Sequence, residues 1–432
     1  MPSSDRPSRL SRRLLLRLGL GAAALPLLAA CQPSTSAPAK PAEGGQPAGA
    51  QPGQAAPAAQ SKVSEVLLGA LFPTSGSLNR PGETIMNAIN LAAEDINAAG
   101  GIKALGGAQV KIVAADTRSD PQVTRTEAER LITSNKLTAL QGAYASAHSL
   151  VASEVTERSE IPFLTASITN PLVERGFKYI FQVSPRASQF GEAQVKLGAQ
   201  VAGESKKGGV FFENTAYGTS TSKGIQDTAA ASGLDLVLFE PYEANFTDAG
   251  PLVNKIKASG AQVLFPVSYP NDTALIVRTM KQQNVKVPLV AGGAGFVLPD
   301  FGKQFGDDAN GVISVEAWNW DISDDSKAVD KKYRAKYNEF IQEYAGEAYN
   351  HMWILVRAME DAKSADPKAV RDALTKLDLT SGPGSMMPGG HVQFDEKGWN
   401  KWAFPVGAQW QKGEFLTVYP KEVAKTQLLR LQ

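Results

Sequence analysis

Residues 66–76 read VLLGALFPTSG, an apolar run that ends in a proline and small polar residues. A short apolar run bounded by turn-forming residues is typical of a buried β-strand that enters a loop. Over residues 83–99, isoleucine and alanine recur at helical spacing until a Gly-Gly pair ends the pattern. A second apolar run, VKIVAA, follows at 110–115. Strand, helix and strand in this order predict a parallel βαβ unit.

The same alternation continues along the chain and predicts two successive parallel sheets. In the first set we expect strands at 66–72, 110–115, 137–141, 162–166 and 179–183, and helices at 83–99, 124–133 and 147–158. From residue 208 the scheme restarts, with strands at 209–212, 234–239, 263–267 and 287–291 and helices at 220–231, 250–259 and 274–282. Repeated βα units form parallel sheets covered by helices on both faces, so we predict an α/β fold with two lobes.

The composition and motifs argue against several classes of protein. The chain has 432 residues and a formal net charge of +1, with acidic and basic residues mixed along its length, so nucleic acid is not an expected partner. A hydrolase needs a nucleophile with a base, but on a helix His148 would point away from Ser146, and no nucleophile-elbow motif is present. Metal-ligand spacing is absent too. We therefore expect no enzyme activity, no metal and no cofactor.

The N-terminus predicts an exported lipoprotein. Basic residues precede an apolar stretch at 18–30, which is too short for a permanent membrane span, and the chain's only cysteine, Cys31, follows. Residues 28–31 read LAAC, which resembles a bacterial lipobox, so we predict a signal peptide over 1–31 that ends at the lipidated Cys31. The less favoured alternative is an ordinary secretory signal with a chance cysteine.

The segment after Cys31 predicts a tether. Residues 32–62 are almost entirely Pro, Ala, Gly, Gln and Ser, a composition that cannot bury enough apolar surface to order itself. The pair Arg12-Arg13 also resembles a twin-arginine export signal. We expect a folded body outside the cytoplasm, in the periplasm or at the cell surface, held to a membrane by its lipid.

Two loops after predicted strands are candidates for a ligand site. Residues 142–146 read GAYAS and residues 167–171 read SITNP. Ligands of parallel sheets bind beyond the carboxyl ends of the strands, and each loop offers backbone amides, a hydroxyl and the start of a helix. Together they predict a site for an anion such as a carboxylate. Equally open is the interpretation that Ser146 and Thr169 only cap their own helices, with Asn170 as an N-cap before Pro171.

Several spaced motifs resemble the branched-chain amino-acid/amide family of solute-binding proteins, which serve ABC importers. The motifs are GALFPTSG at 69–76, AEDINAAGGI at 93–102, DTRSDP at 116–121, the two loops above, and VQFDEKG at 392–398. The resemblance covers nearly the whole body. It implies a periplasmic-binding protein type I fold, with two Rossmann-like lobes joined by three hinge strands. The N-lobe would comprise 64–187 plus 317–394, and the C-lobe 188–316 plus 395–432.

The same resemblance implies roles for individual residues. Ser146 and Thr169 would bind the ligand carboxylate through their hydroxyls and amides, and the Ser167 carbonyl would accept a hydrogen bond from the ligand ammonium. Tyr217 and Tyr269, from the opposite lobe, would close over the ligand. The predicted site also includes Tyr144 and Ala145, which belong to the first loop.

The sequence departs from this family at Gly293. Amino-acid binders of the family usually have an acidic residue in this loop, where it pairs with the α-ammonium, but residues 292–295 read GGAG. A buried ammonium without a carboxylate partner is costly, so a carboxylic acid or amide becomes a possible ligand. Glu316 could supply the charge, although a charge on the hinge surface is slightly favoured. Arg80 could meet a second anionic group, although a solvated loop arginine is the commoner outcome.

The expected function is binding without chemistry. A small carboxylate-bearing ligand, which could be a branched-chain or other amino acid, an amide or a related acid, would favour the closed form of the cleft. An ABC permease and its ATPase would then receive the ligand from a monomeric binding protein. The alternative is a ligand-sensing receptor component with the same fold.

Overall fold

The structure is a computed structural model that describes residues 63–430 of the chain. The predicted signal peptide, the lipidation site Cys31 and the predicted tether lie outside the described residues. Among residues 63–430, no helix combines the length and the apolar character that crossing a membrane requires.

The first sheet is entirely parallel and has the strand order β2-β1-β3-β4-β5. Its strands are β1 (Glu65–Phe72), β2 (Gln109–Asp116), β3 (Leu137–Gly142), β4 (Phe163–Thr165) and β5 (Ile180–Gln182). In β1, Leu71 pairs with Ala115 on one side and with Gly142 on the other. The five strands expected from the apolar runs are therefore confirmed.

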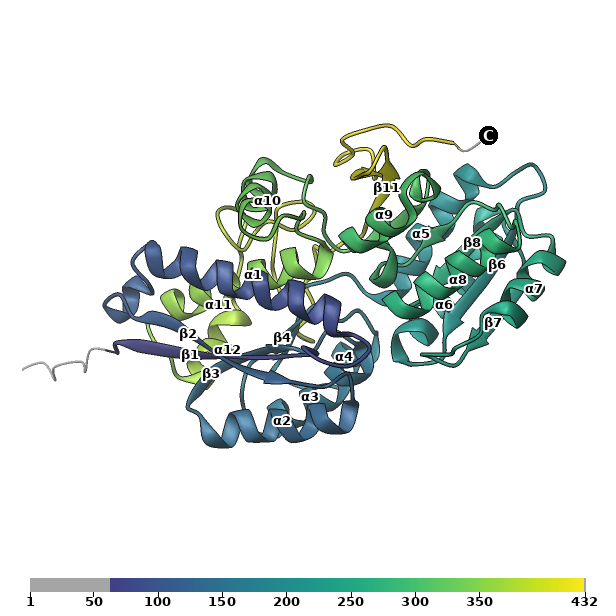
Figure 1. Cartoon of the computed structure of the whole chain (residues 1–432). Coiled ribbons are helices and arrows are strands. Elements are labelled where there is room, and N and C mark those ends of the chain that lie inside the picture. Colours follow the sequence, from purple (N-terminus) through teal and green to yellow (C-terminus); the bar gives the residue numbers. More distant parts are fainter. Residues whose placement is uncertain (1–62, 431–432) are drawn as a thin grey trace, which may run out of the picture. The chain divides into compact units, whose positions relative to one another are not determined.

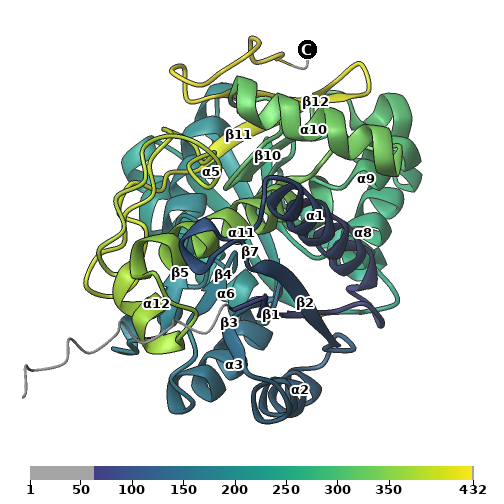
Figure 2. The same ribbon diagram turned by 90° about the vertical axis from the view of Figure 1, so that its left-hand side faces the viewer.

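Helices cover both faces of the first sheet (Figure 1). On one face lie α1 (Asn79–Ala98), α11 (Glu343–Ala362) and α12 (Pro367–Leu374), with α10 (Asp324–Tyr337) packed against α1. On the other face lie α2 (Pro121–Ser134) and α3 (Ser146–Arg158), as Figure 2 also shows. Leu131 of α2 and Val155 of α3 pack with Leu140 and Phe163 of the sheet. The apolar side of each helix thus faces the sheet, as the helical spacing predicts.

The second sheet repeats this arrangement with the order β7-β6-β8. Its strands are β6 (Lys207–Glu213), β7 (Asp235–Tyr242) and β8 (Val263–Val267), and its helices are α5 (Ala187–Val201), α6 (Ala216–Ala229), α7 (Gly250–Ser259) and α8 (Pro270–Gln282). Helices α5 and α6 pack very closely at Gly191. A Cβ added to this residue would lie only 2.4 Å from the Ile225 nitrogen. Only glycine permits this approach.

The third sheet has the order β12-β11-β10-β9 and mixes strand directions. Its strands are β9 (Val290–Ala291), β10 (Ile313–Glu316), β11 (Val406–Gln411) and β12 (Glu414–Tyr419). β10 is parallel to β9 and antiparallel to β11, and a bridge between Leu264 and Leu289 connects this sheet to the second one. Helix α9 (Pro299–Phe305) covers it through contact between the rings of Phe301 and Trp410. The sequence patterns do not predict this antiparallel hairpin.

The chain passes three times between the elements of the first sheet and those of the other two. It leaves after β5, returns after β10 into α10, and leaves again before β11. The remaining short elements are the one-turn helix α4 (Pro171–Glu174) and the 3₁₀ turns η1 (Lys103–Leu105), η2 (Ala230–Ser232), η3 (Ala294–Phe296) and η4 (Gly306–Ala309). The predicted α/β class with parallel sheets is confirmed.

Candidate ligand-binding cleft

The two predicted loops meet around a small cavity. Its lining residues are Tyr144, Ser146, Ala166, Ser167, Ile168, Tyr217, Tyr269 and Tyr344. The first five follow strands β3 and β4 of the first sheet, whereas Tyr217 belongs to α6 and Tyr269 precedes α8 on the second sheet. The structure therefore brings Tyr144, Ser146, Ser167, Tyr217 and Tyr269 together, as the sequence analysis expects of a site between two sheets.

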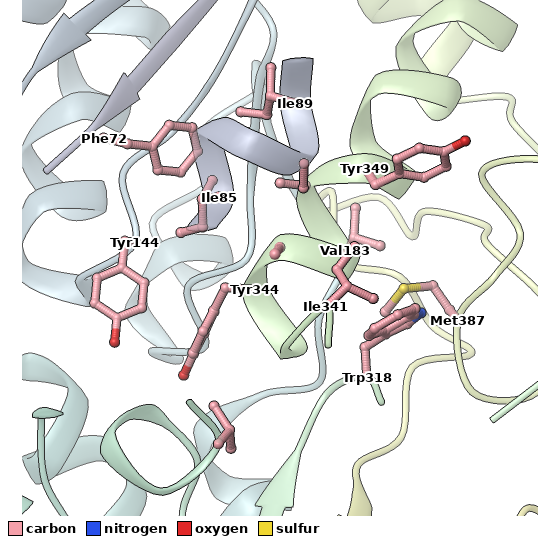
Figure 3. Packing of buried hydrophobic residues seen from close by; sticks show 14 of the residues in the cluster. Phe72, Ile85, Ile89, Tyr144, Val183, Trp318, Ile341, Tyr344, Tyr349 and Met387 are labelled. Atoms are coloured by element: carbon pink, nitrogen blue, oxygen red, sulfur yellow. The ribbon is translucent and has the colours of Figure 1, made fainter. Parts of the chain in front are cut away.

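Tyrosine rings fill most of this cavity. Tyr144 packs edge-on against Tyr344 with 4.8 Å between ring centroids, and Tyr217 lies 5.1 Å from Tyr269. Figure 3 shows Tyr144 and Tyr344 side by side with their hydroxyls pointing the same way. The free volume is about 10 Å³, roughly what one water molecule requires. A ligand the size of an amino acid therefore requires the rings, or the elements that carry them, to move apart.

Hydrogen bonds tie the loops after β3 and β4 to each other. The Ser149 hydroxyl accepts from the Ala143 amide at 2.9 Å and lies 2.5 Å from the Ser167 hydroxyl. Ser167 in turn donates to the Tyr144 carbonyl at 2.9 Å. Tyr144 has a φ of +71°, which is rare for a residue with a side chain, and its buried hydroxyl has no partner. The hydrogen bond to its carbonyl fixes the backbone of Tyr144 in this unusual conformation, and the Tyr144 ring lines the cavity.

Ser146 lies at the start of a true helix. It is the first residue of α3, which follows Ala145 as the N-cap, and no side chain caps this helix end. The interpretation that Ser146 merely caps its own helix is thus not what the structure shows. Ser146 lines the cavity at the positive end of a helix of 13 residues. Such an end favours an anion.

The second predicted anion-binding loop is different. Thr169 is fully buried but does not line the cavity, and its hydroxyl lies 2.7 Å from the Ser220 hydroxyl of α6. The helix after it, α4, has only 4 residues, and the Asn170 side chain does not cap it but accepts from the Ser188 amide at 3.4 Å. The expectation of a second helix dipole here is wrong, because one turn of helix has little macrodipole.

The cavity residue Tyr344 and its buried neighbour Glu343 were not expected from the sequence, because α11 was not predicted. The Tyr344 hydroxyl accepts from the Ala294 amide at 3.3 Å. Glu343, at the first position of α11, accepts from the Ala317 amide at 2.6 Å through Oε1, while its buried Oε2 has no partner. Burial raises the pKa of Glu343 to about 8. A pair of glutamates four residues apart at the start of this helix, Glu343 and Glu347, is the signal that could have drawn attention to them.

Glu316 is not a surface charge, so that interpretation is wrong. It lies in β10 with no exposed area, and neither of its carboxyl oxygens has a partner. Burial, followed by the nearby charge of Glu343, raises the pKa of Glu316 well above its usual value. Glu316 is not among the residues that line the cavity.

Arg80 is not a solvated loop residue either, because α1 begins at Asn79, four residues before the predicted start. Its Nε lies 2.8 Å from Asp300 of α9, and its Nη2 bonds to the nearly buried Glu339. Protein carboxylates therefore hold this guanidinium, and we do not include Arg80 in the proposed ligand site. Within residues 63–430, no cluster of His, Cys, Asp or Glu is arranged to hold a metal ion.

Comparison with known proteins identifies the family. A family model described as periplasmic binding protein matches residues 65–402. Leu/Ile/Val-binding protein homolog 8 of Brucella melitensis is 30% identical over 379 residues, which cover 84% of this chain and 92% of that protein. Homolog 7 of the same organism is 28% identical over 386 residues, covering 84% and 94%.

Solved structures share the fold. LivJ, the branched-chain amino acid transporter substrate-binding protein of Streptococcus pneumoniae in complex with isoleucine, gives a TM-score of 0.72 at 23% identity over 82% of this chain and 100% of that chain. The leucine-binding protein LivK of Thermotoga maritima gives 0.72 at 21% identity, covering 82% and 97%. Fold and matches together define an extracytoplasmic solute-binding protein and not an enzyme. The chain belongs to the periplasmic binding protein family, in the type I group that includes the Leu/Ile/Val-binding proteins.

Proposed function

We propose that this chain binds a small carboxylate-bearing ligand outside the cytoplasm and delivers it to an ABC importer. The ligand is a branched-chain or other amino acid, or an amide or related acid that also carries a carboxylate. The single observation that carries the proposal is the position of Ser146 at the uncapped start of α3, in a cavity that Tyr217 and Tyr269 line from the second sheet. One side of the cavity thus offers amides and a hydroxyl to an anion, and the other offers aromatic rings.

Binding works through closure of two lobes around the ligand. We propose an N-lobe of residues 64–187 plus 317–394 and a C-lobe of 188–316 plus 395–432. A ligand that contacts Ser146 on one lobe and Tyr217 on the other stabilises the closed arrangement in proportion to its preference for that arrangement. The ABC permease then recognises the closed arrangement and accepts the ligand.

The N-terminal sequence supports the location. A lipid on Cys31 and a tether over 32–62 keep the folded body close to the membrane that carries the permease. Mass spectrometry of the membrane-extracted protein tests this: the mature chain should begin at a diacylglyceryl-modified Cys31, and Cys31→Ser should release the protein from the membrane. Replacing Arg12-Arg13 with two lysines should block export if the twin-arginine route is used.

A thermal-shift panel tests the binding function. The panel contains the amino acids, their amides, and aromatic and dicarboxylic acids, each added in excess to the purified protein. Because a ligand that binds only the folded state stabilises it by mass action, at least one carboxylate should raise the melting temperature. If no carboxylate in the panel shifts the transition, or if only compounds without a carboxylate do so, the proposal fails.

A further inference from the structure

Two ion pairs connect the proposed lobes outside the cavity. Arg80, near the start of α1, bonds to Asp300 of α9 with 2.8 Å between Nε and Oδ2. In the opposite sense, Lys303 of α9 lies 3.9 Å from Oε2 of Glu339. Arg80 and Glu339 belong to the proposed N-lobe, whereas Asp300 and Lys303 belong to the proposed C-lobe. Each lobe thus presents one cation and one anion to the other, and we call these two contacts the interlobe ion pairs.

On the N-lobe, Arg80 and Glu339 are fixed to the same group of elements. The Arg80 Nη2 bonds to Glu339, whose side chain is only 6% exposed. Gln342 donates to the Thr84 hydroxyl of α1 at 2.8 Å, and Tyr333 of α10 donates to the Thr84 carbonyl at 3.1 Å. These bonds join α1 to α10 and to the segment that carries Glu339. The cation and the anion of this lobe therefore move together.

On the C-lobe, packing of α9 holds Asp300 and Lys303 in place. The ring of Phe301, which lies between them in the sequence, is 6.0 Å from that of Trp410 in the third sheet. A Cβ on Gly302 would come within 2.3 Å of the same Trp410 ring, so the helix lies directly on this sheet. Because Asp300 and Lys303 are three residues apart, they lie on one side of α9, and this pair also moves as a unit.

A neutral hydrogen bond joins the lobes near the same place. Asn271, in the first turn of α8, donates to the Ser77 carbonyl just before α1 at 3.2 Å. Neither these two residues nor the four charged ones are among those that line the cavity. The contacts therefore act on the arrangement of the lobes and not on a ligand in the cavity.

We infer that the interlobe ion pairs hold the two lobes closed at a place that the ligand does not touch, and so set the ratio of closed to open protein. The inference rests on the proposed function, because it requires lobes that move apart. An interaction made only in the closed arrangement shifts the equilibrium toward it by its own free energy. Every ligand of the closed arrangement gains affinity by the same factor.

The size of the effect follows from the exposure of the charges. The side chains of Asp300 and Lys303 are 49% and 63% exposed, so water and salt screen both pairs. Since exposed ion pairs contribute modestly, removing the Asp300 charge should lower the closed-to-open ratio about threefold. Raising the salt concentration to about 0.5 M should lower it too, because the screening length becomes shorter.

Distance measurements between two spin labels on the ligand-free protein test the inference. Cys31 is the only cysteine of the chain, so Cys31→Ser gives a background without cysteines. Asn90→Cys on α1 and Lys257→Cys on α7 then place one label on each proposed lobe, at positions that are exposed. Electron paramagnetic resonance of the labelled chain reports the short and long distances and their proportions, at low salt and at about 0.5 M KCl.

The labelled background is compared with Asp300→Asn, Lys303→Gln, the double variant and the control Glu83→Gln. Glu83 is a matched control because its carboxylate also lies near Arg80, at 3.4 Å, but belongs to the same helix and so cannot connect the lobes. Circular dichroism verifies that each variant is folded.

We expect the background to show a short and a long distance. Asp300→Asn should reduce the short-distance population about threefold relative to the long one, Lys303→Gln should reduce it less, and Glu83→Gln should leave it unchanged. High salt should reduce it in the background but hardly in the double variant. One distance shared by all proteins, an unchanged ratio in the double variant, or an equal change in Glu83→Gln would overturn the inference.

These outcomes are independent of the test of the proposed function. A carboxylate that raises the melting temperature in the thermal-shift panel supports ligand binding, whatever the label distances show. If the label distances respond as expected but no carboxylate shifts the transition, the interlobe ion pairs stand and the proposed ligand class is contradicted.

Discussion

Glu343 Oε2 lies 3.2 Å from the position that a Cβ on Gly293 would occupy. Gly293 has φ +85° and ψ −145°, a backbone region that is open almost only to glycine. The loop after β9 therefore holds no side chain at this point, and a carboxylate from α11 approaches the same space. The acid that the family resemblance leads one to expect in this loop is absent, but another acid lies next to its place.

A side chain on Gly293 should destabilise the protein. Gly293→Ala forces alanine into this backbone region and places a methyl group against Glu343, Tyr344 and the Val315 carbonyl. We expect the free energy of unfolding to fall by about 1–3 kcal/mol, measured by urea denaturation. Gly413→Ala is the control, because Gly413 has a similar φ of +83° but no heavy atom within 4 Å. An equal loss of unfolding free energy in the two variants would show that contact of the added methyl group with Glu343, Tyr344 and Val315 does not destabilise the protein.

Removal of the Ser146 hydroxyl should weaken ligand binding. Ser146→Ala deletes one donor to a buried carboxylate and should cost about 1–3 kcal/mol of binding free energy, measured by titration calorimetry with the ligand found in the panel. Ser153→Ala is the control, because Ser153 lies two turns further along α3 and donates to the Leu150 carbonyl. An unchanged affinity in Ser146→Ala, with a folded protein, would remove Ser146 from the site.

The stability of the protein should depend on pH through Glu343. Its pKa rises from an ordinary 4.5 to about 8 on burial, so between these values the native state keeps a proton that the unfolded chain has lost. This contribution to stability is fully present below about pH 4.5, declines by about 1.4 kcal/mol per pH unit as pH rises, and is lost above about pH 8. Glu343→Gln cannot titrate.

Urea denaturation of both proteins from pH 5 to pH 8 measures this difference. The free energy of unfolding of wild type should fall relative to that of Glu343→Gln as pH rises. Comparison with the variant cancels the opposite contribution of the buried histidines His148 and His351, whose pKa values are lowered by burial. A constant difference over this range would mean that Glu343 is already ionised in the native protein.

The Arg80 ion pairs should contribute to stability. Arg80 joins α1 to Asp300 of α9 and to Glu339, whose side chain is only 6% exposed. Arg80→Met leaves that carboxylate without its main partner and should lower the free energy of unfolding by about 2 kcal/mol. Glu83→Gln, which removes a 62% exposed partner of the same arginine, should change it by less than about 0.5 kcal/mol. If both variants changed the free energy of unfolding by less than about 0.5 kcal/mol, the Arg80 ion pairs would contribute no more than ordinary surface ion pairs.

Much of the fold could be predicted because buried parallel strands are apolar runs with clear ends. Helix α11 is buried along most of its length, and its polar residues Glu343, Glu347 and Asn350 are buried too, so its polarity does not mark a solvent-exposed face. Gly346 within it lies so close to Trp318 that a Cβ would come within 2.2 Å of the ring, which makes glycine necessary inside the helix. The hairpin of β11 and β12 depends on pairing with β10, almost a hundred residues earlier in the chain.

The cavity could be predicted only in part. Ser146, Ser167, Tyr217 and Tyr269 follow predicted strands, where parallel sheets place their ligands, and the family motifs name them. Glu343 lies near this loop only because tertiary packing brings α11 against Gly293, and no local sequence pattern predicts that contact. Thr169 shows the reverse: its loop is correctly located, but its hydroxyl bonds to α6.

We propose that the carboxylate of the bound ligand lies at the start of α3. Comparing the affinity for an acid with that for its neutral carboxamide tests this proposal most directly. Titration calorimetry should be performed with the best-binding acid of the panel and with the amide of the same acid, on wild type and Ser146→Ala. The account predicts that the acid binds wild type at least tenfold more tightly than the amide, and that Ser146→Ala reduces this ratio. Equal affinity of wild type for the acid and its amide would contradict the account.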